Sequence, residues 1–246
     1  MMTMPKIDKQ IVLTIILLLF FSLETVVAQK SDWADTSNDR LHAIEADTIT
    51  KRGYTLVWIN KDPDFEQALK QQLIDVFFVN YPKLVRKYNK ESRKEITFVI
   101  DPDYEGIAAT ADGIVRYNPA WFVKNPHDID IVTHEVMHIV QAYPADSGPG
   151  WLVEGIADYV REVYGVDNAA ANWSLPDLTE DQHYTNSYRI AARFLLWIEE
   201  NKKKGIVKKL DTALRNKSYT EELWAEHTTM SLDELWNTYV QAEISE

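Results

Sequence analysis

The sequence predicts an α+β protein with two lobes, because segments typical of strands come first and segments typical of helices follow. β-branched and aromatic residues gather between turn residues in three segments, at 54–60, 96–101 and, as a hairpin, 106–118. An amphipathic helix is predicted among them at 64–79. After residue 143, apolar positions recur mainly at helical spacing. We therefore expect a strand-containing lobe over 53–143 and a helical lobe over 144–246.

Residues 1–28 have the composition of a secretory signal peptide. Lys6 and Lys9 precede an apolar run at 11–23, and small residues allow cleavage after Ala28. The run is shorter than the ~20 residues of a membrane-spanning helix. An uncleaved anchor is the alternative, but the short run and the cleavage site favour a secreted or periplasmic protein that has no membrane contact after cleavage.

The composition restricts the partners of the mature chain. The formal net charge is −12, which argues against nucleic acid and anionic membranes as partners. The chain has no cysteine, so an exported form depends on core packing or a bound metal instead of disulfides. Residues 29–52 are polar and lack periodicity, which predicts a loose N-terminal arm. Nothing in the sequence indicates an oligomeric state.

A metal-binding motif lies in the segment "NPHDIDIVTHEVMHIVQAY". Asn125 and Pro126 are typical of a helix start, so the sequence predicts a helix over about 126–142. His134 and His138 are four residues apart and therefore share one face of that helix. Glu135 can reach a water on an ion held by both rings. The alternative is a chance match between two unrelated histidines.

The next helix, "WLVEGIADYVREVYG", ends at Gly165 and supports the metal hypothesis. The break "PADSGPG" would fold it back across the first helix, so that Glu154 completes a three-ligand site open to a water. Asp158, one turn further, can bond the second ring nitrogen of a ligand histidine. Gly155 allows close approach of the backbone. An ordinary surface pair of carboxylates is disfavoured, because the residues around them are small or apolar.

These two segments carry a family resemblance. "HEVMH", followed after 15 residues by "EGIADYVR", resembles the gluzincin branch of zinc metallopeptidases. With Gln141 and "SYRIAARFLLWI", it is more closely similar to the peptidase family of plants and bacteria that includes the plant basic secretory proteins. The resemblance covers about 53–246 and implies a zincin-like fold. The basic charge of the plant relatives is absent, so no property tied to that charge is expected here.

The resemblance also implies roles for individual residues. His134, His138 and Glu154 would bind one catalytic Zn²⁺, with Glu135 as the catalytic base and Asp158 orienting a ligand. A tyrosine or histidine from the later part of the chain would stabilise the oxyanion. Tyr188 is our first candidate, and His183 and Tyr184 are the alternatives; a core tyrosine is an equally valid interpretation of Tyr188.

The sequence therefore predicts a secreted zinc metallopeptidase that hydrolyses peptide bonds in a peptide or protein substrate. The edge of the hairpin at 106–118 is the expected place for the substrate backbone. Two alternatives stay open: a zinc hydrolase of a non-peptide bond, and a catalytically silent secreted zinc-binding protein. The acidic segment 101–113 lacks the spacing of an EF-hand, so we expect a solvated turn between strands there, with a calcium site as the less favoured alternative.

Overall fold

The computed structural model describes residue 33 and residues 35–245. The predicted signal peptide lies outside the described residues, and its cleavage stays a prediction. The chain divides into two compact units after His42. The first unit contains the short helix α2 (Ser37–Leu41), and the second contains the sheet and all the helices described below. Within the described part of the chain, no helix is both long and apolar enough to cross a membrane.

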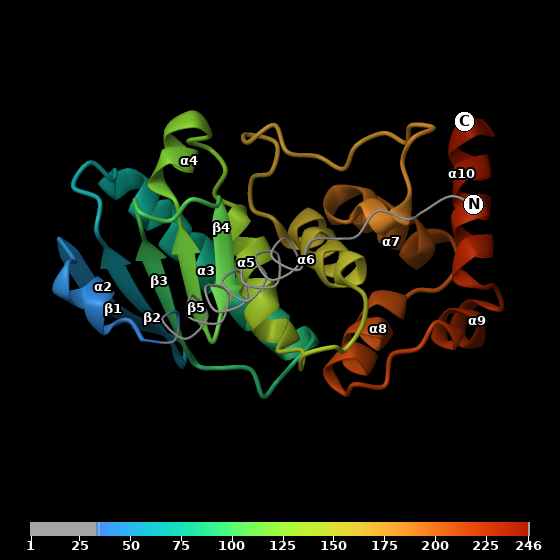
Figure 1. Ribbon diagram of the computed structural model, residues 1–246, viewed down its shortest axis with the longest axis horizontal. Helices are drawn as coiled ribbons and strands as arrows, with labels where there is room; N and C mark the ends of the chain where they lie inside the picture. Colours follow the sequence, from blue (N-terminus) through green and yellow to red (C-terminus); the bar gives the residue numbers. More distant parts are fainter. Residues whose placement is uncertain (1–32, 34, 246) are drawn as a thin grey trace, which may run out of the picture. The chain divides into compact units, whose positions relative to one another are not determined.

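A five-stranded mixed sheet forms one side of the larger unit, in the order β1-β2-β3-β5-β4 (Figure 1). The strands are β1 (Glu45–Lys51), β2 (Tyr54–Asn60), β3 (Glu95–Ile100), β4 (Ala108–Ala111) and β5 (Ile114–Tyr117). β2, β3 and β5 run parallel, whereas β1 and β4 are antiparallel to their neighbours. The short strand β4 is therefore a sheet edge whose outer backbone groups are available for pairing.

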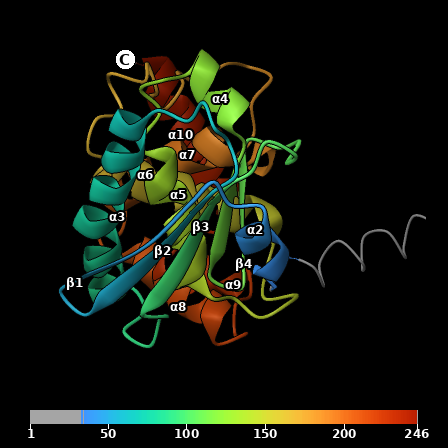
Figure 2. The same ribbon diagram turned by 90° about the vertical axis from the view of Figure 1, so that its left-hand side faces the viewer.

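Two helices, α3 (Gln67–Lys87) and α5 (Ile131–Gln141), pack on one face of this sheet (Figure 2). Alternate strand residues turn toward them, as the period of two requires. The ring of Phe98 on β3 meets Phe77 of α3 edge to face, with 5.5 Å between centroids. It contacts Tyr117 on β5 in the same way at 5.3 Å. This aromatic core fixes α3 against the sheet, on the same face of the sheet as α5.

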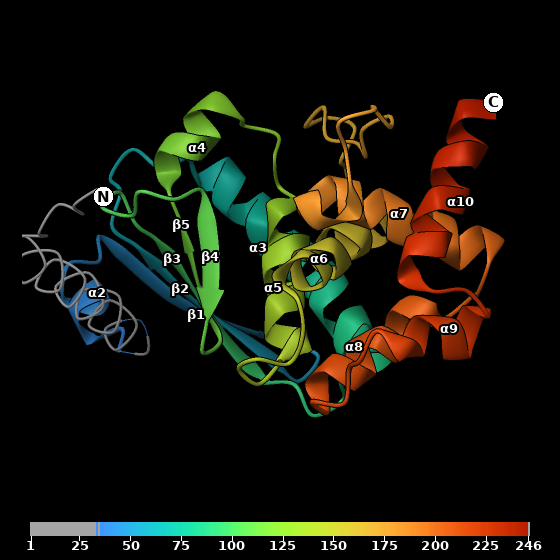
Figure 3. The ribbon, with the colours of Figure 1, turned by 45° about the vertical axis from the view of Figure 1, so that its right-hand side comes forward.

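The remaining helices continue from α5 in chain order (Figure 3). They are α6 (Gly150–Tyr164), the short 3₁₀ helix η1 (Tyr184–Asn186), α7 (Tyr188–Asn201), α8 (Ile206–Arg215), α9 (Glu222–Thr228) and α10 (Leu232–Ser245). α6 packs between α5 and α7. The α+β class predicted from the sequence is confirmed, and the division into two lobes stays a prediction.

The predicted loose arm is wrong for its last residues. β1 pairs with β2 along its full length from Glu45 to Lys51. The strand has no apolar alternation because most of its side chains are exposed. Its polar side chains have a partner on α3: the ammonium group of Lys70 contacts both Glu45 and Asp47. These ion pairs and the backbone ladder hold a segment that its composition does not identify as a strand.

The predicted helix over 126–142 is too long at its start. A separate helix, α4 (Pro119–Lys124), precedes it, and the Asn118 side chain caps α4 by accepting from the amide of Ala120 at 2.9 Å. Residues 125–130 form a turn, and α5 begins only at Ile131. The turn is held by tertiary contacts, above all the buried ion pair of Asp128 with Arg161 at 2.5 Å. Asn125 therefore ends α4 and does not cap α5.

Candidate active site

Helix α5 presents the motif histidines to the same side. Its first turn is fixed by the fully buried Asp130, which accepts hydrogen bonds from the backbone amides of Val166 and Asp167 at 2.8 and 2.6 Å. His134 is buried and His138 is partly buried. Their rings meet edge to face with 4.8 Å between centroids. The predicted pairing of the two rings on one helix face is thus present.

Helix α6 brings the third side chain to these rings. It can lie close to α7 because residue 155 is glycine: a Cβ there would be 2.7 Å from the Cβ of Ala191. The Glu154 oxygen Oε2 is 3.3 Å from Nε2 of His134 and 3.4 Å from Nε2 of His138. The two Nε2 atoms are 3.1 Å apart. Three ligand atoms therefore form a nearly equilateral triangle.

This triangle has the size that zinc requires. Ligand atoms at 2.0–2.1 Å from a tetrahedral zinc are about 3.3–3.4 Å from one another. The two separations from Glu154, 3.3 and 3.4 Å, agree with that value, and the 3.1 Å between the two Nε2 atoms is slightly shorter. Within the described residues, His134, His138 and Glu154 are a group of side chains whose potential ligand atoms converge and could hold a metal ion. The side chains thus fit a single zinc ion that keeps a fourth position for water.

Each histidine is oriented through its other ring nitrogen. Nδ1 of His134 is 2.7 Å from Oδ1 of Asp158, the contact that the sequence predicts. Nδ1 of His138 is 2.7 Å from Oε1 of Gln141, and the Gln141 amide donates to the Val153 carbonyl at 2.9 Å. A carboxylate or carbonyl oxygen accepts, so both Nδ1 atoms donate, and both Nε2 atoms face the triangle, where they would bind a metal.

The electrostatics of this group favour a cation. Burial lowers the pKa of His134, but the hydrogen bonds to Asp158 and Glu154 outweigh burial and raise that pKa to about 10. Burial favours a neutral Glu154, yet the two imidazoles hold the pKa of its carboxyl well below the usual range. Positive charge is therefore stabilised between the rings. A divalent cation supplies this charge while both imidazoles stay neutral.

Glu135 lies beside the triangle and is not part of it. Its carboxylate accepts a hydrogen bond from the Thr110 hydroxyl at 2.7 Å, and the same hydroxyl lies 3.1 Å from the Glu135 carbonyl. Thr110 belongs to the edge strand β4. A cavity of about 940 Å³ opens over these groups and is lined by Glu135, the His134, His138 and Glu154 side chains, and residues 106–110. The edge strand, the Glu135 carboxylate and the triangle of potential ligands therefore face one cavity.

The three candidates for oxyanion stabilisation are placed differently. Tyr188 lines the cavity, and its ring stacks near that of His134 with 6.4 Å between centroids. The charge of Glu154, with partial burial, raises the pKa of Tyr188, so its hydroxyl keeps the proton that a donor needs. Tyr184 is buried and its hydroxyl donates to Asp233 at 3.0 Å. Neither Tyr184 nor His183 lines this cavity.

The sequence analysis did not predict the roles of two residues in the site, Thr110 and Gln141. Thr110 holds Glu135, and Gln141 orients His138. Gln141 lies three residues after His138 on the same helix, so an amide at this spacing was the available signal. The predicted solvated turn at 101–113 includes Asp101, whose carboxylate is paired with Lys61 and Arg116 at 2.5 and 2.9 Å.

An α+β fold in which two histidines and a glutamate converge beside a second glutamate is typical of the metallopeptidase class. The family model for the peptidase of plants and bacteria matches residues 40–239, and the chain belongs to this family. No protein with a curated description matches the chain.

Solved structures with a similar fold are zinc metallopeptidases. The M1 zinc metallopeptidase from Deinococcus radiodurans aligns with a TM-score of 0.51 at 14% identity, over 80% of this chain and 51% of that chain. A variant of it bound to a Tyr-Ser-Ala substrate gives 0.51 at 13% with the same coverage. A two-domain M1 zinc metallopeptidase bound to L-tryptophan gives 0.50 at 13%, also with the same coverage. This chain spans about half the length of these proteins, and the likeness shows the fold.

Proposed function

We propose that the protein is a secreted zinc-dependent metallopeptidase in which His134, His138 and Glu154 hold the ion and Glu135 is the general base. One observation carries the proposal: the three ligand atoms form a triangle of zinc dimensions inside a cavity that Glu135 and an edge strand also line. Zinc bound there would lower the pKa of a water and polarise the carbonyl of the scissile bond.

The side chains of this protein then have distinct tasks. Glu135 accepts the proton of the attacking water and passes it to the leaving amine, while Thr110 holds its carboxylate in place. The Tyr188 hydroxyl donates to the oxyanion. The outer edge of β4 pairs with the substrate backbone, because β4 pairs with β5 on one side only and no described strand lies on its other side.

Cleavage of a mixed peptide library by wild type and Glu135→Gln tests this function. The variant keeps the size of the side chain and removes its basicity, so we expect a loss of at least about a hundredfold in cleavage with equal zinc content. Equal cleavage by both proteins would refute the role of Glu135. Zinc binding without cleavage by wild type would instead support the silent zinc-binding alternative, and cleavage only of non-peptide esters would support the other hydrolase.

A further inference from the structure

Four of the side chains that line the cavity form a row in which each contacts the next, and we call them the arginine wall: Trp121, Asp128, Arg161 and Trp173. The Trp121 indole donates to Asp128 at 2.8 Å, and Asp128 pairs with Arg161 at 2.5 Å. The Arg161 guanidinium lies 4.3 Å from the ring centroid of Trp173. Asp128 and Arg161 are 6% and 4% exposed, so these charges are built into the protein and are not surface groups.

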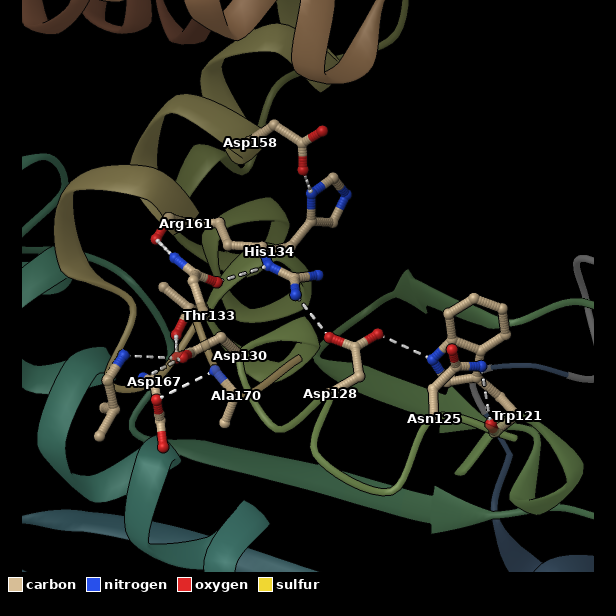
Figure 4. A network of polar contacts seen from close by, with 12 residues as sticks. Trp121, Asn125, Asp128, Asp130, Thr133, His134, Asp158, Arg161, Asp167 and Ala170 are labelled. Carbon is tan, nitrogen blue, oxygen red and sulfur yellow. Dashed lines mark hydrogen bonds and ion pairs between the residues drawn. The ribbon is translucent and has the colours of Figure 1, made fainter. Parts of the chain in front are cut away.

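The guanidinium of Arg161 has one nitrogen left for a ligand. Nε donates to Asn168 at 3.1 Å and Nη2 donates to Asp128. No hydrogen-bond partner is present for Nη1 among the residues that the structure describes, and Arg161 lines the cavity. In Figure 4 this third nitrogen points to the same side as Nε2 of His134. A fixed donor therefore faces the space in which a substrate would lie.

The arginine wall lies within reach of a substrate side chain next to the cleaved bond. Arg161 follows Glu154 by seven residues on α6, which places it on the same helix face about 10 Å further along. Ile131, which also lines the cavity, precedes Glu135 by four residues and extends the same floor. The space between Glu154 and the arginine wall thus suits a long substrate side chain.

Resting on the proposed peptidase function, we propose that the arginine wall is the main specificity pocket and selects a bulky side chain with a neutral oxygen acceptor. Tyrosine fits best, and glutamine is the second choice. The two indoles and Ile131 favour an aromatic ring, and Nη1 of Arg161 donates to the oxygen at its end. A phenylalanine or leucine leaves that buried donor unpaired, which costs affinity.

The charges of the pocket select against ionised side chains. Both oxygens of Asp128 are engaged, one by Arg161 and one by Trp121, so a lysine or arginine finds no free carboxylate here. Asp128 already balances the charge of Arg161. A substrate carboxylate would be desolvated in a cavity that Glu135, Glu154 and Asp158 also line. Substrate side chains that end in a neutral oxygen acceptor should therefore bind this pocket most tightly.

The test compares matched peptides that differ in one side chain next to the cleaved bond. We expect wild type to favour tyrosine over phenylalanine, and glutamine over methionine, by about tenfold or more in kcat/KM. Amidated and free C-termini are compared in parallel. Equal rates for tyrosine and phenylalanine would overturn the proposal, and so would a preference that follows the free C-terminal carboxylate and ignores the side chain.

A pair of variants assigns the preference to the wall. Replacing the ion pair with apolar side chains, Arg161→Met together with Asp128→Leu, removes donor and charge at similar volume. The variant should still cleave the phenylalanine peptide and lose the tyrosine preference. The matched control Arg189→Met removes the exposed cavity arginine, which donates to the Ser174 carbonyl at 3.2 Å, and should keep the preference. The opposite pattern would overturn the assignment.

A binding measurement separates this proposal from the proposed function. In the Glu135→Gln protein, uncleaved tyrosine peptides should bind about tenfold tighter than phenylalanine peptides, as followed by tryptophan fluorescence. If wild type cleaves no peptide, the proposed function fails, and the specificity of the pocket is then tested by the difference in peptide binding alone. If peptides are cleaved while binding and cleavage ignore the tyrosine hydroxyl, the specificity proposal fails and the peptidase function stands.

Discussion

Replacing Gln141 with methionine should weaken zinc binding more than it disturbs the fold. Gln141 is 2% exposed and joins His138 to the Val153 carbonyl, one residue before Glu154. Methionine has similar shape but no amide. The change removes the partner of the partly buried Nδ1 of His138, at about 1–3 kcal/mol, and one of the hydrogen bonds of the Val153 carbonyl. The loss of an orienting partner weakens metal affinity about 10- to 100-fold.

The affinity loss can be measured as a difference in stabilisation. At saturating zinc, a 10- to 100-fold weaker affinity lowers the zinc-induced stabilisation by about 1.4–2.7 kcal/mol. Urea unfolding of metal-free and zinc-loaded protein gives this increment for wild type and Gln141→Met. Tyr81→Phe is the control: it removes a buried hydroxyl bonded to Ser92 and Arg93. The control should lose stability and keep the full zinc increment.

An unchanged zinc increment in Gln141→Met would refute the reasoning. It would mean that the ring of His138 holds its ligand geometry without the amide contact. An equal reduction in Tyr81→Phe would also refute it, because the increment would then report general stability and not the orientation of the ligand.

Three further predictions concern other parts of the molecule. Tyr188→Phe should lower kcat about 10²–10³-fold with little change in KM, and Tyr184→Phe should not; equal kcat for Tyr188→Phe and wild type would contradict the oxyanion role. Gly155→Ala should destabilise by about 1–3 kcal/mol in urea unfolding, although alanine favours helices, because α7 is too close; a stabilised variant would contradict this packing. Burial raises the pKa of Tyr81 to about 12, so its contribution is complete below about pH 10 and is lost between pH 10 and 12. Between pH 10 and 12 the unfolding free energy of Tyr81→Phe should therefore fall less steeply than that of wild type, by about 1.4 kcal/mol per pH unit. An identical pH slope for the two proteins would contradict the raised pKa of Tyr81.

The convergence of His134, His138 and Glu154 could be predicted because helix periodicity fixes much of its geometry locally. His134 and His138 share a face whatever surrounds them, and Glu154 and Asp158 are related in the same way on the next helix. The predicted approach of the second helix to the first needed only the short break between them. Gly155 instead allows α6 to lie close to α7.

The errors lie where tertiary contacts decide local structure. The turn before α5 has helix-start residues, but Asp128 is drawn to Arg161, which is 33 residues later in the chain. β1 is held by Lys70 of α3 and by its ladder with β2, and neither contact has a local signal in the strand. The arginine wall was likewise not predicted, because its members come from α4, a turn, α6 and a loop.

Zinc-edge anomalous diffraction from crystals of the zinc-loaded protein tests the central claim most directly. The account predicts one ion with Nε2 of His134, Nε2 of His138 and an oxygen of Glu154 each about 2.0–2.2 Å away. The Glu135 carboxylate should lie near the ion without binding it. An anomalous peak elsewhere, no peak at saturating zinc, or Glu135 in place of Glu154 as the ligand would contradict the proposed metal centre.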